Sequence, residues 1–456
     1  MSSPTTAVPP TDPKTLRRVV GAGFLGTTIE YYDYFIYGTA AALVFPKVFF
    51  PELGAAAATA ASFATFAVAF VARPFGGVVF GHIGDRIGRK ATLVATLLMM
   101  GISTILIGIL PSGATIGVAA PIILIVLRFL QGLAVGGEWS SAALFVGEYA
   151  PPKKRGLYAL APSLGTSGGL LVATVTFLIT GFTMSNETFL AWGWRIPFLL
   201  SVVLVAVGLW VRLGVADTPI FRAAQERAAA AAKAKLPIAE LLRNQPKQML
   251  LAAGAILFWQ PFFTVCAVFL INYATNALEL SRNVTLTVTL VAIVFCIAGT
   301  VLGGSLADRL GRRRTMLLAN GFGVFWAFAL FPLADTRNPV LLGLAISLAL
   351  FAVGITSSTM TAYMPEIFRT DYRSTGTGAA FNLGSAVGGS IPSIVAAPLL
   401  ASFGGIGVAI LLSVFALVAT LSVAALRETR GRSLDDTLAA ASAADDIAVR
   451  PAAEPA

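Results

Sequence analysis

The chain has 456 residues, of which 57% are hydrophobic and only 12% are charged, and its formal net charge is +10. A soluble globular domain carries roughly 25% charged residues, so this composition excludes a soluble globular fold and predicts a membrane protein. Two cysteines, Cys266 and Cys296, and one histidine, His82, are too few for a disulfide framework or a structural metal site.

Twelve apolar segments follow in chain order, each near the roughly 20 residues that cross a bilayer as a helix. The first six are Val19–Val44, Ala57–His82, Ala91–Leu110, Ala119–Tyr149, Leu157–Thr183 and Gly193–Val215. The second six are Met249–Thr275, Val288–Leu306, Met316–Leu333, Val340–Tyr363, Ser374–Ala401 and Gly405–Leu426. This pattern predicts an all-α membrane protein with twelve transmembrane helices in two six-helix halves.

The predicted domains are a tail at residues 1–18, a first half at 19–215, a linker at 216–248, a second half at 249–427 and a tail at 428–456. The linker is rich in Ala, Lys and Arg and predicts a short helix on the water side. Alternate connections differ sharply in Lys and Arg: 26 lie on the side of both tails and the linker, and 4 on the other side. This bias predicts that both termini are cytoplasmic, and it explains the basic net charge without nucleic-acid binding.

Two short charged motifs occur once in each half. The loop from Gly81 to Lys90 and the loop from Gly304 to Arg314 both contain Asp-Arg-x-Gly-Arg, with a shift of 223 residues from Asp85 to Asp308. A Glu and an Arg seven residues apart also recur with a shift of 218, as Glu148 with Arg155 and as Glu366 with Arg373. Internal repeats in a membrane protein are typical of transporters whose substrate site lies between the halves.

Charged residues within the first half's spans are the candidates for chemistry, because ionisable groups in a membrane span are costly and usually mark a pathway. Glu30 and Asp33 lie near the middle of the first span and share one helix face, since they are three residues apart. Arg73 and Arg128 lie near the middle of the second and fourth spans, and Glu138 lies deeper in the fourth. We expect these acids and arginines to neutralise one another and to exchange partners when a proton or substrate binds.

The spans of the second half contain neutral polar and aromatic groups in place of such charges. Candidates for lining a substrate site are Tyr34, Gln131, Gln260, Asn272, Tyr273 and Asn382. The alternatives are that Glu30–Arg128 or Asp33–Arg73 are fixed structural ion pairs, and that Glu138 serves packing or gating.

Taken together, these motifs resemble those of the major facilitator superfamily, and in particular its metabolite:proton symporter family. The resemblance covers roughly residues 20–432. It is carried by the two Asp-Arg-x-Gly-Arg loops and by Glu30-Tyr-Tyr-Asp33-Tyr, Arg73-Pro74-Phe-Gly, Arg128-Phe-Leu-Gln131-Gly132, Gly136-Gly137-Glu138-Trp139, Trp192-Gly-Trp194-Arg195-Ile-Pro197 and Glu428-Thr-Arg430-Gly431.

The resemblance implies alternating access, in which two halves rock about a central cavity, in a multi-pass protein of a bacterial plasma (inner) membrane. It implies that Glu30, Asp33 and Arg128 serve coupling and binding, driven by the proton gradient without a cofactor. It also implies that a cytoplasmic gate contains Asp85, Arg86, Arg89, Glu148, Arg155, Asp308, Arg309, Arg312, Glu366 and Arg373. The implied partners are the substrate, the proton and the bilayer, with no obligatory protein partner.

The predicted function is proton-coupled uptake of a small polar metabolite, such as a shikimate-like or dicarboxylic acid, because embedded arginines suit an anion and embedded acids suit a proton. The alternatives are proton-driven multidrug efflux and a facilitative sugar or zwitterion carrier. Against efflux, the fifth span reads Ala161-Pro162-Ser163-Leu-Gly165 and matches the Gly-Pro element of those relatives poorly. A membrane enzyme would need a nucleophile–base pair, a metal cluster or a phosphate loop, and the sequence offers none of them.

Overall fold

A computed structural model describes residues 13–87, 89–136, 155–216, 237–369 and 372–431, and every regular element in these ranges is a helix. In the first half the helices are α1 (Pro13–Leu43), α2 (Phe45–Val48), α3 (Ala55–Ile87), α4 (Arg89–Ile109), α5 (Gly113–Ile116), α6 (Ala119–Val135), α8 (Arg155–Tyr158), α9 (Leu160–Thr183), α10 (Asn186–Thr188), the π-helix η2 (Phe189–Gly193) and α11 (Arg195–Ala216).

After residue 236 the first helix is α13 (Pro237–Asn244), which lies within the predicted linker at residues 216–248. The helices that follow are α14 (Pro246–Ala255), α15 (Trp259–Thr264), the π-helix η3 (Val265–Phe269), α16 (Leu270–Asn272), the π-helix η4 (Tyr273–Ala277), α17 (Arg282–Leu310), α18 (Arg312–Asp335), α19 (Pro339–Ile367), α20 (Arg373–Phe403) and α21 (Gly405–Ala425).

These helices supply the twelve predicted spans. Nine helical segments in the described residues are long and apolar enough to cross a membrane, and a tenth span is the pair formed by Asn186–Gly193 and Arg195–Val211, which bends by 45°. The 31-residue α1 and the 17-residue α6 complete the set. The predicted fold class is confirmed.

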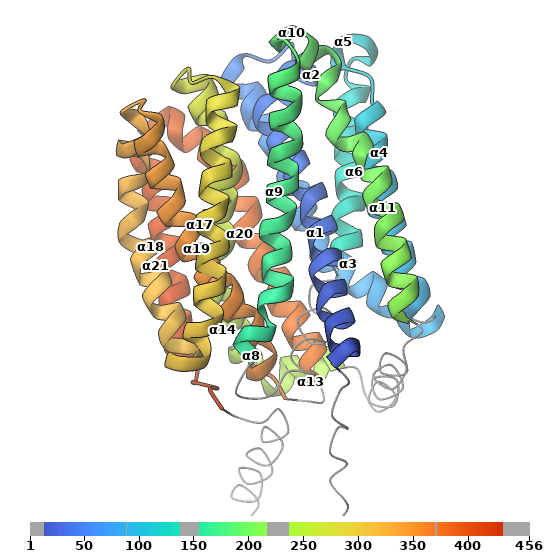
Figure 1. Ribbon diagram of the computed structural model, residues 1–456, viewed down its shortest axis with the longest axis vertical. Helices are drawn as coiled ribbons and strands as arrows, with labels where there is room; N and C mark the ends of the chain where they lie inside the picture. Colours follow the sequence, from blue (N-terminus) through green and yellow to red (C-terminus); the bar gives the residue numbers. More distant parts are fainter. Residues whose placement is uncertain (1–12, 88, 137–154, 217–236, 370–371, 432–456) are drawn as a thin grey trace, which may run out of the picture.

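The two halves stand side by side as bundles of roughly parallel and antiparallel helices (Figure 1). The most extensive packing between helices of different halves is α3 against α20 and α9 against α17. The start of α1 and the end of α21 lie at the same end of the molecule, together with α8 and α13 (Figure 1). We refer to this end as the cytoplasmic end, following the charge count, and to the opposite end as the outer end.

The seventh span departs from the uninterrupted helix that its hydropathy predicts. It runs from Pro246 to Ala277 as α14, a turn at residues 256–258, α15 and two five-residue π-helices, η3 and η4. Single π turns within α-helices are rare and are often found at functional sites. Of the nine segments that are long and apolar enough to cross a membrane, this one is the most buried, with 89% of its most apolar stretch inside the protein. It therefore passes through the centre of the protein.

The tenth span is longer than predicted, and this changes where a charge lies. α19 continues to Ile367, four residues past the predicted end at Tyr363, so Glu366 belongs to the last turn of the helix. The expectation for the second half concerned charges near the middle of its spans, whereas Glu366 is a buried charge, at 6% exposure, at the cytoplasmic end of one of its helices. The hydropathy pattern stops at the charge, whereas the helix continues because a neighbouring arginine compensates it.

Candidate functional site

Asp33 lies in the centre of the first half and is bound by hydroxyl groups. It is 3% exposed, and Ser201 on α11 donates a hydrogen bond to its Oδ1 at 2.8 Å. Thr104 on α4 donates to its Oδ2 at 3.1 Å, and Thr104 in turn accepts a hydrogen bond at 2.7 Å from Nε2 of Gln131. Oε1 of Gln131 accepts from Nη1 of Arg128 at 3.0 Å. Asp33 therefore reaches Arg128 through two neutral side chains, and the fixed Asp33–Arg73 ion pair is not formed.

The two embedded arginines face aromatic rings. The guanidinium carbon of Arg128 lies 4.1 Å from the ring centroid of Tyr37, and those of Arg128 and Arg73 each lie 5.9 Å from that of Tyr34. Both arginines are at least 96% buried, and within the described ranges Nε and Nη2 of Arg128 and Nε of Arg73 have no hydrogen-bond partner. Guanidinium N–H groups are donors only, so the unused donors favour an anion.

Tyr34 connects these arginines to the second half. Its hydroxyl lies 3.4 Å from the hydroxyl of Thr264 and accepts a long hydrogen bond, at 3.5 Å, from Nε2 of Gln260, and both of these residues are on α15. One turn earlier on α1, Tyr31 meets Trp259 edge-to-face with ring centroids 6.4 Å apart. Arg73, Arg128, Tyr31, Tyr34 and the broken seventh span thus form one buried cluster between the halves, which we call the cluster around Tyr34.

Two of the predicted lining residues lie elsewhere, closer to the outer end of the seventh span. Asn272 donates to the backbone oxygen of Ala42 at 2.7 Å, which ties the two halves together at the end of α1. The hydroxyl of Tyr273 donates to Asp335 at the end of α18. The structure therefore brings neither residue to the cluster around Tyr34.

Other predicted residues are distributed as follows. Asn382 on α20 donates to the backbone oxygen of Gly136 at 2.5 Å, so it joins α20 to the end of α6 on the cytoplasmic side of the cluster. Glu30 is buried on α1, at 4% exposure. Glu138 and Glu148 lie outside the described residues.

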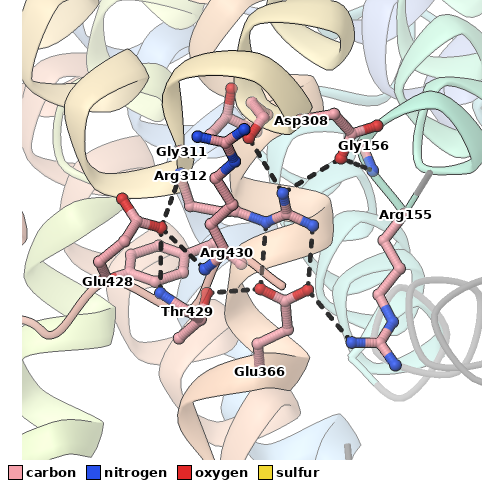
Figure 2. Close-up of polar contacts among 12 residues, drawn as sticks. Arg155, Gly156, Asp308, Gly311, Arg312, Glu366, Glu428, Thr429 and Arg430 are labelled. Carbon is pink, nitrogen blue, oxygen red and sulfur yellow. Dashed lines mark hydrogen bonds and ion pairs between the residues drawn. The ribbon is translucent and has the colours of Figure 1, made fainter. Parts of the chain in front are cut away.

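A second set of charges closes the cytoplasmic end (Figure 2). Arg312, at the start of α18, donates from Nε and Nη2 to the two oxygens of Glu366 at 3.1 and 3.2 Å, and from Nη1 to Asp308 at 3.1 Å. Arg155 of the first half approaches Glu366 at 3.5 Å. A bidentate hydrogen-bonded ion pair of this kind, between an arginine and a carboxylate, is strong and directional.

Asp308 also holds the first half directly. Its two carboxylate oxygens accept hydrogen bonds from the backbone N–H groups of Gly156 and Leu157, at 3.0 and 3.1 Å. Those amides belong to α8, and Gly156 packs so closely on α17 that an added Cβ would lie 2.5 Å from the backbone oxygen of Gly304. The acid of the second-half motif therefore binds across the two halves at the cytoplasmic end.

The segment after α21 belongs to the same network, which the sequence interpretation missed. The carboxylate of Glu428 accepts from the backbone N–H groups of Arg312 and Arg313 at 2.9 and 3.0 Å, and so caps the N-terminus of α18 (Figure 2). The hydroxyl of Thr429 donates to Glu366 at 2.5 Å. The Glu428-Thr-Arg430-Gly431 motif was noted only as part of the family resemblance, and a glutamate after a last helix gives no sign of which distant helix it caps.

The remaining gate candidates do not all enter this network. Arg309 is exposed on α17 and makes no hydrogen bond or ion pair with the rest of the described chain, whereas Arg373 is buried at the start of α20. The helical backbone is described at Asp85, Arg86 and Arg89, but the predictions for their side chains fall outside what the structure describes.

The outer end has its own contacts between the halves. Arg282, at the start of α17, donates to the backbone oxygen of Gly181 at 3.1 Å and to Asn186 at 3.4 Å, both in the first half. Its guanidinium carbon lies 3.9 Å from the ring centroid of Phe189. The halves are therefore joined at both ends, and opening to either side requires one of the two sets to break.

The architecture and the buried charges together define a membrane carrier with a polar centre between two six-helix halves. A sequence model of the Major Facilitator Superfamily matches residues 23–393. The chain is 42% identical to the inner membrane metabolite transport protein YhjE of Escherichia coli over 91% of this chain and 95% of that protein. It is 40% identical to the shikimate transporter of the same organism, over 85% and 89% of the two chains.

A crystal structure of a D-xylose-proton symporter superposes with a TM-score of 0.73 at 18% identity, covering 91% of this chain and 99% of that one, so this likeness concerns the fold alone. The chain belongs to the major facilitator superfamily. The predictions of a multi-pass membrane transporter, and of a transporter in place of an enzyme, are confirmed by this membership.

Proposed function

We propose that this protein imports a small metabolite carrying a carboxylate, together with a proton, by alternating access. The observation that carries the proposal is the pair of buried arginines, Arg73 and Arg128, which face the same Tyr34 ring with unused N–H donors. A buried cation without an anionic partner is costly, so a substrate carboxylate in this place would be strongly bound. Supporting relatives are a metabolite transport protein and a shikimate transporter.

Neutral groups on the opposite wall are suited to the rest of the substrate. Gln260 and Thr264 of the second half offer an amide and a hydroxyl beside Tyr34, and such groups can hydrogen-bond hydroxyl substituents of an organic acid. Trp259 and Tyr31 supply apolar surface for its carbon skeleton. A hydroxylated organic acid therefore fits this site better than an apolar cation, which the arginines would repel.

The proton site in this proposal is Asp33, a carboxylate separate from the arginines and held by two hydroxyls. Both termini would face the cytoplasm, in keeping with 26 Lys and Arg on their side against 4 on the other. A fluorescent reporter fused after Ala456 tests this orientation, because it should fluoresce in intact cells, whereas a periplasmic alkaline phosphatase fused there should be inactive.

Transport by purified protein in liposomes tests the function. Shikimate, succinate, glycine betaine and xylose are offered with the outside acidic, and a protonophore is added in a parallel set. We expect a carboxylate to accumulate above its external concentration only while the proton gradient lasts. Asp33→Asn should abolish accumulation but keep exchange of internal for external substrate, whereas Glu52→Gln, in an exposed outer loop, should change neither.

Accumulation of xylose alone, or carboxylate uptake that ignores both the protonophore and Asp33→Asn, would refute the proposal. Accumulation of glycine betaine, with no uptake of shikimate or succinate, would instead assign a zwitterion carrier.

A further inference from the structure

Three hydrogen bonds in a row link Arg128 to Asp33 within the first half, and the chemistry of the groups sets their direction. Arg128 can only donate, so Gln131 must present its amide oxygen to Arg128, as it does at 3.0 Å. The amide NH₂ of Gln131 then faces Thr104 at 2.7 Å, and the Thr104 hydroxyl must accept there. Its own proton is left for Asp33, at 3.1 Å. Every donor in the chain therefore points from the arginine toward the acid.

The Thr104 hydroxyl has two acceptors for its one proton. Besides Oδ2 of Asp33 at 3.1 Å, it reaches the backbone oxygen of Met100, one turn earlier on α4, at 2.9 Å. When Asp33 is ionised, the carboxylate is the stronger acceptor and the hydroxyl points to it. When Asp33 carries a proton, the hydroxyl can turn to Met100 without leaving any group unsatisfied. Thr104 thus has two hydrogen-bonded arrangements, and the charge of Asp33 selects between them.

We infer that Thr104 and Gln131 are positioning residues that carry the coupling between the proton site at Asp33 and the anion site at Arg128. This inference rests on the proposed function and adds the path of the coupling to it. Hydrogen bonds in a chain polarise one another, so the negative charge on Asp33 strengthens the hydrogen bond from Arg128 to Gln131. Protonation of Asp33 removes that charge and weakens this hydrogen bond. Arg128 then binds a substrate carboxylate more strongly. By reciprocity, a bound carboxylate favours the proton on Asp33.

Among the residues that the structure describes, few other titratable groups face Asp33. The groups that face it from α4 and α11 are the Thr104 and Ser201 hydroxyls. The charged group that acts on Asp33 is the guanidinium of Arg128 on α6. The neighbouring titratable residue on α1 is Tyr32, whose hydroxyl donates a hydrogen bond to the backbone oxygen of Pro197 at 2.7 Å. Thr104, Gln131 and Arg128 are all at least 97% buried, so the chain is shielded from water.

A double-mutant cycle on the ligand-free protein tests the chain without any substrate. Infrared difference spectra against Asp33→Asn follow the carboxyl band of Asp33 through a pH titration in wild type, Thr104→Val, Gln131→Met and the double variant. Gln131 does not touch Asp33, yet we expect Gln131→Met to shift its titration midpoint. We also expect Asp33 to have the same titration midpoint in the double variant as in Thr104→Val alone. The reason is that Thr104→Val already breaks the hydrogen-bonded connection between Gln131 and Asp33. An unmoved midpoint in Gln131→Met, or additive shifts, overturns the inference.

The second measurement is shikimate binding at acidic and at alkaline pH. Coupling between sites typically amounts to about 5- to 150-fold, so wild type should bind shikimate more tightly at acidic pH by a factor in this range. Thr104→Val should reduce that ratio to within about twofold, and Thr104→Ser, which keeps the hydroxyl, should restore it. Thr96→Val is the matched control, because it removes a buried hydroxyl of the same helix whose only hydrogen bond within the described residues is to the backbone oxygen of Leu93.

These outcomes separate the inference from the proposed function. If wild type accumulates shikimate with protons but Thr104→Val and Gln131→Met keep the full pH ratio, the coupling path is wrong and the symporter stands. If wild type neither binds nor accumulates any carboxylate, the proposed function fails, and the ligand-free cycle still decides whether the chain transmits charge. If Thr104→Val does not fold, Gln131→Met by itself still tests the coupling path, because it leaves Thr104 unchanged.

Discussion

Arg128 is a buried cation that forms no ion pair with any residue in the described part of the chain. Its guanidinium donates a hydrogen bond to Gln131 and lies near the rings of both Tyr37 and Phe66, whose centroids are 4.1 and 5.0 Å from the guanidinium carbon. Cation–π contacts in a desolvated site are worth about 2 kcal/mol or more, which offsets part of the cost of burial. The aromatic rings leave the remaining N–H groups unused, as a binding site for an anion requires.

Replacing Arg128 with lysine should weaken carboxylate binding. Lysine keeps the charge but loses the planar fork that can hold Gln131 and a carboxylate at once. A hydrogen bond to a charged group contributes about 1.5–3 kcal/mol, so the dissociation constant should rise by roughly 10- to 150-fold. Isothermal titration with shikimate or succinate measures this. Arg195→Lys is the control, because Arg195 is a partly buried arginine at the start of α11 that donates to the backbone oxygen of Leu110. Equal affinity in wild type and Arg128→Lys would leave Arg128 with a structural role only.

The helices of the first half approach one another through glycine. α3 and α6 cross so closely that a Cβ at Gly132 would lie 2.7 Å from Cα of Ala69, and Gly136 has similarly close contact with the backbone of Arg73. Small residues let membrane helices approach to backbone contact. This crossing sets the positions of both embedded arginines, since Arg73 is on α3 and Arg128 is one turn before Gly132 on α6.

Gly132→Ala should therefore destabilise the protein and disturb the anion site together. Overpacking of this kind costs about 1–3 kcal/mol, because two backbones must move apart. Gly343→Ala is the matched control: its Cβ would meet only Cγ1 of Val288, at an ordinary 3.7 Å, and alanine favours the helix. Thermal unfolding in detergent should show a lower midpoint for Gly132→Ala and an unchanged or higher one for Gly343→Ala. Equal midpoints would mean that the crossing relaxes without cost.

Among the contacts between the halves of the carrier, two sets at opposite ends of the molecule oppose each other. Glu366, Arg312, Asp308 and Arg155 join the halves at the cytoplasmic end, and Arg282 joins them at the outer end. A rocking motion about the centre cannot keep both ends closed and also admit substrate. The relative strength of the two sets therefore determines which side opens.

Glu366→Gln should favour opening to the cytoplasm, and Arg282→Gln should favour opening to the outside. Removing one partner of a buried ion pair costs up to about 3–5 kcal/mol, and here the cost falls on the closed cytoplasmic end. Spin labels at the exposed residues Leu157 and Leu310 should move apart in Glu366→Gln, whereas labels at Phe182 and Val340 should move apart in Arg282→Gln. Pulsed electron–electron double resonance measures both distances.

The control for these distances is Arg309→Gln, because Arg309 is exposed on the same helix as Asp308 and lies outside the network. If Arg309→Gln and Glu366→Gln change the cytoplasmic distance equally, the network does not act as a latch.

Much of the architecture could be predicted because its signals are local. Twelve apolar runs and the Lys and Arg between them report on each helix separately, since a helix satisfies its own backbone in lipid. The cost of burying charge made Glu30, Asp33, Arg73 and Arg128 visible in the same way. Thr104 and Ser201 gave no signal, because a hydroxyl in an apolar helix can bond to its own backbone and needs no partner elsewhere.

Hydropathy and charge order therefore specify that this chain lies in a bilayer as two related sets of helices, because transfer free energy depends on each segment alone. Which donor meets which acceptor depends on helix rotation and on close packing between segments far apart in the chain. That is why Asp33 binds Ser201 and Thr104 and not Arg73, and why Glu428 caps α18 beside Glu366: these partners are brought together only by the folded bundle.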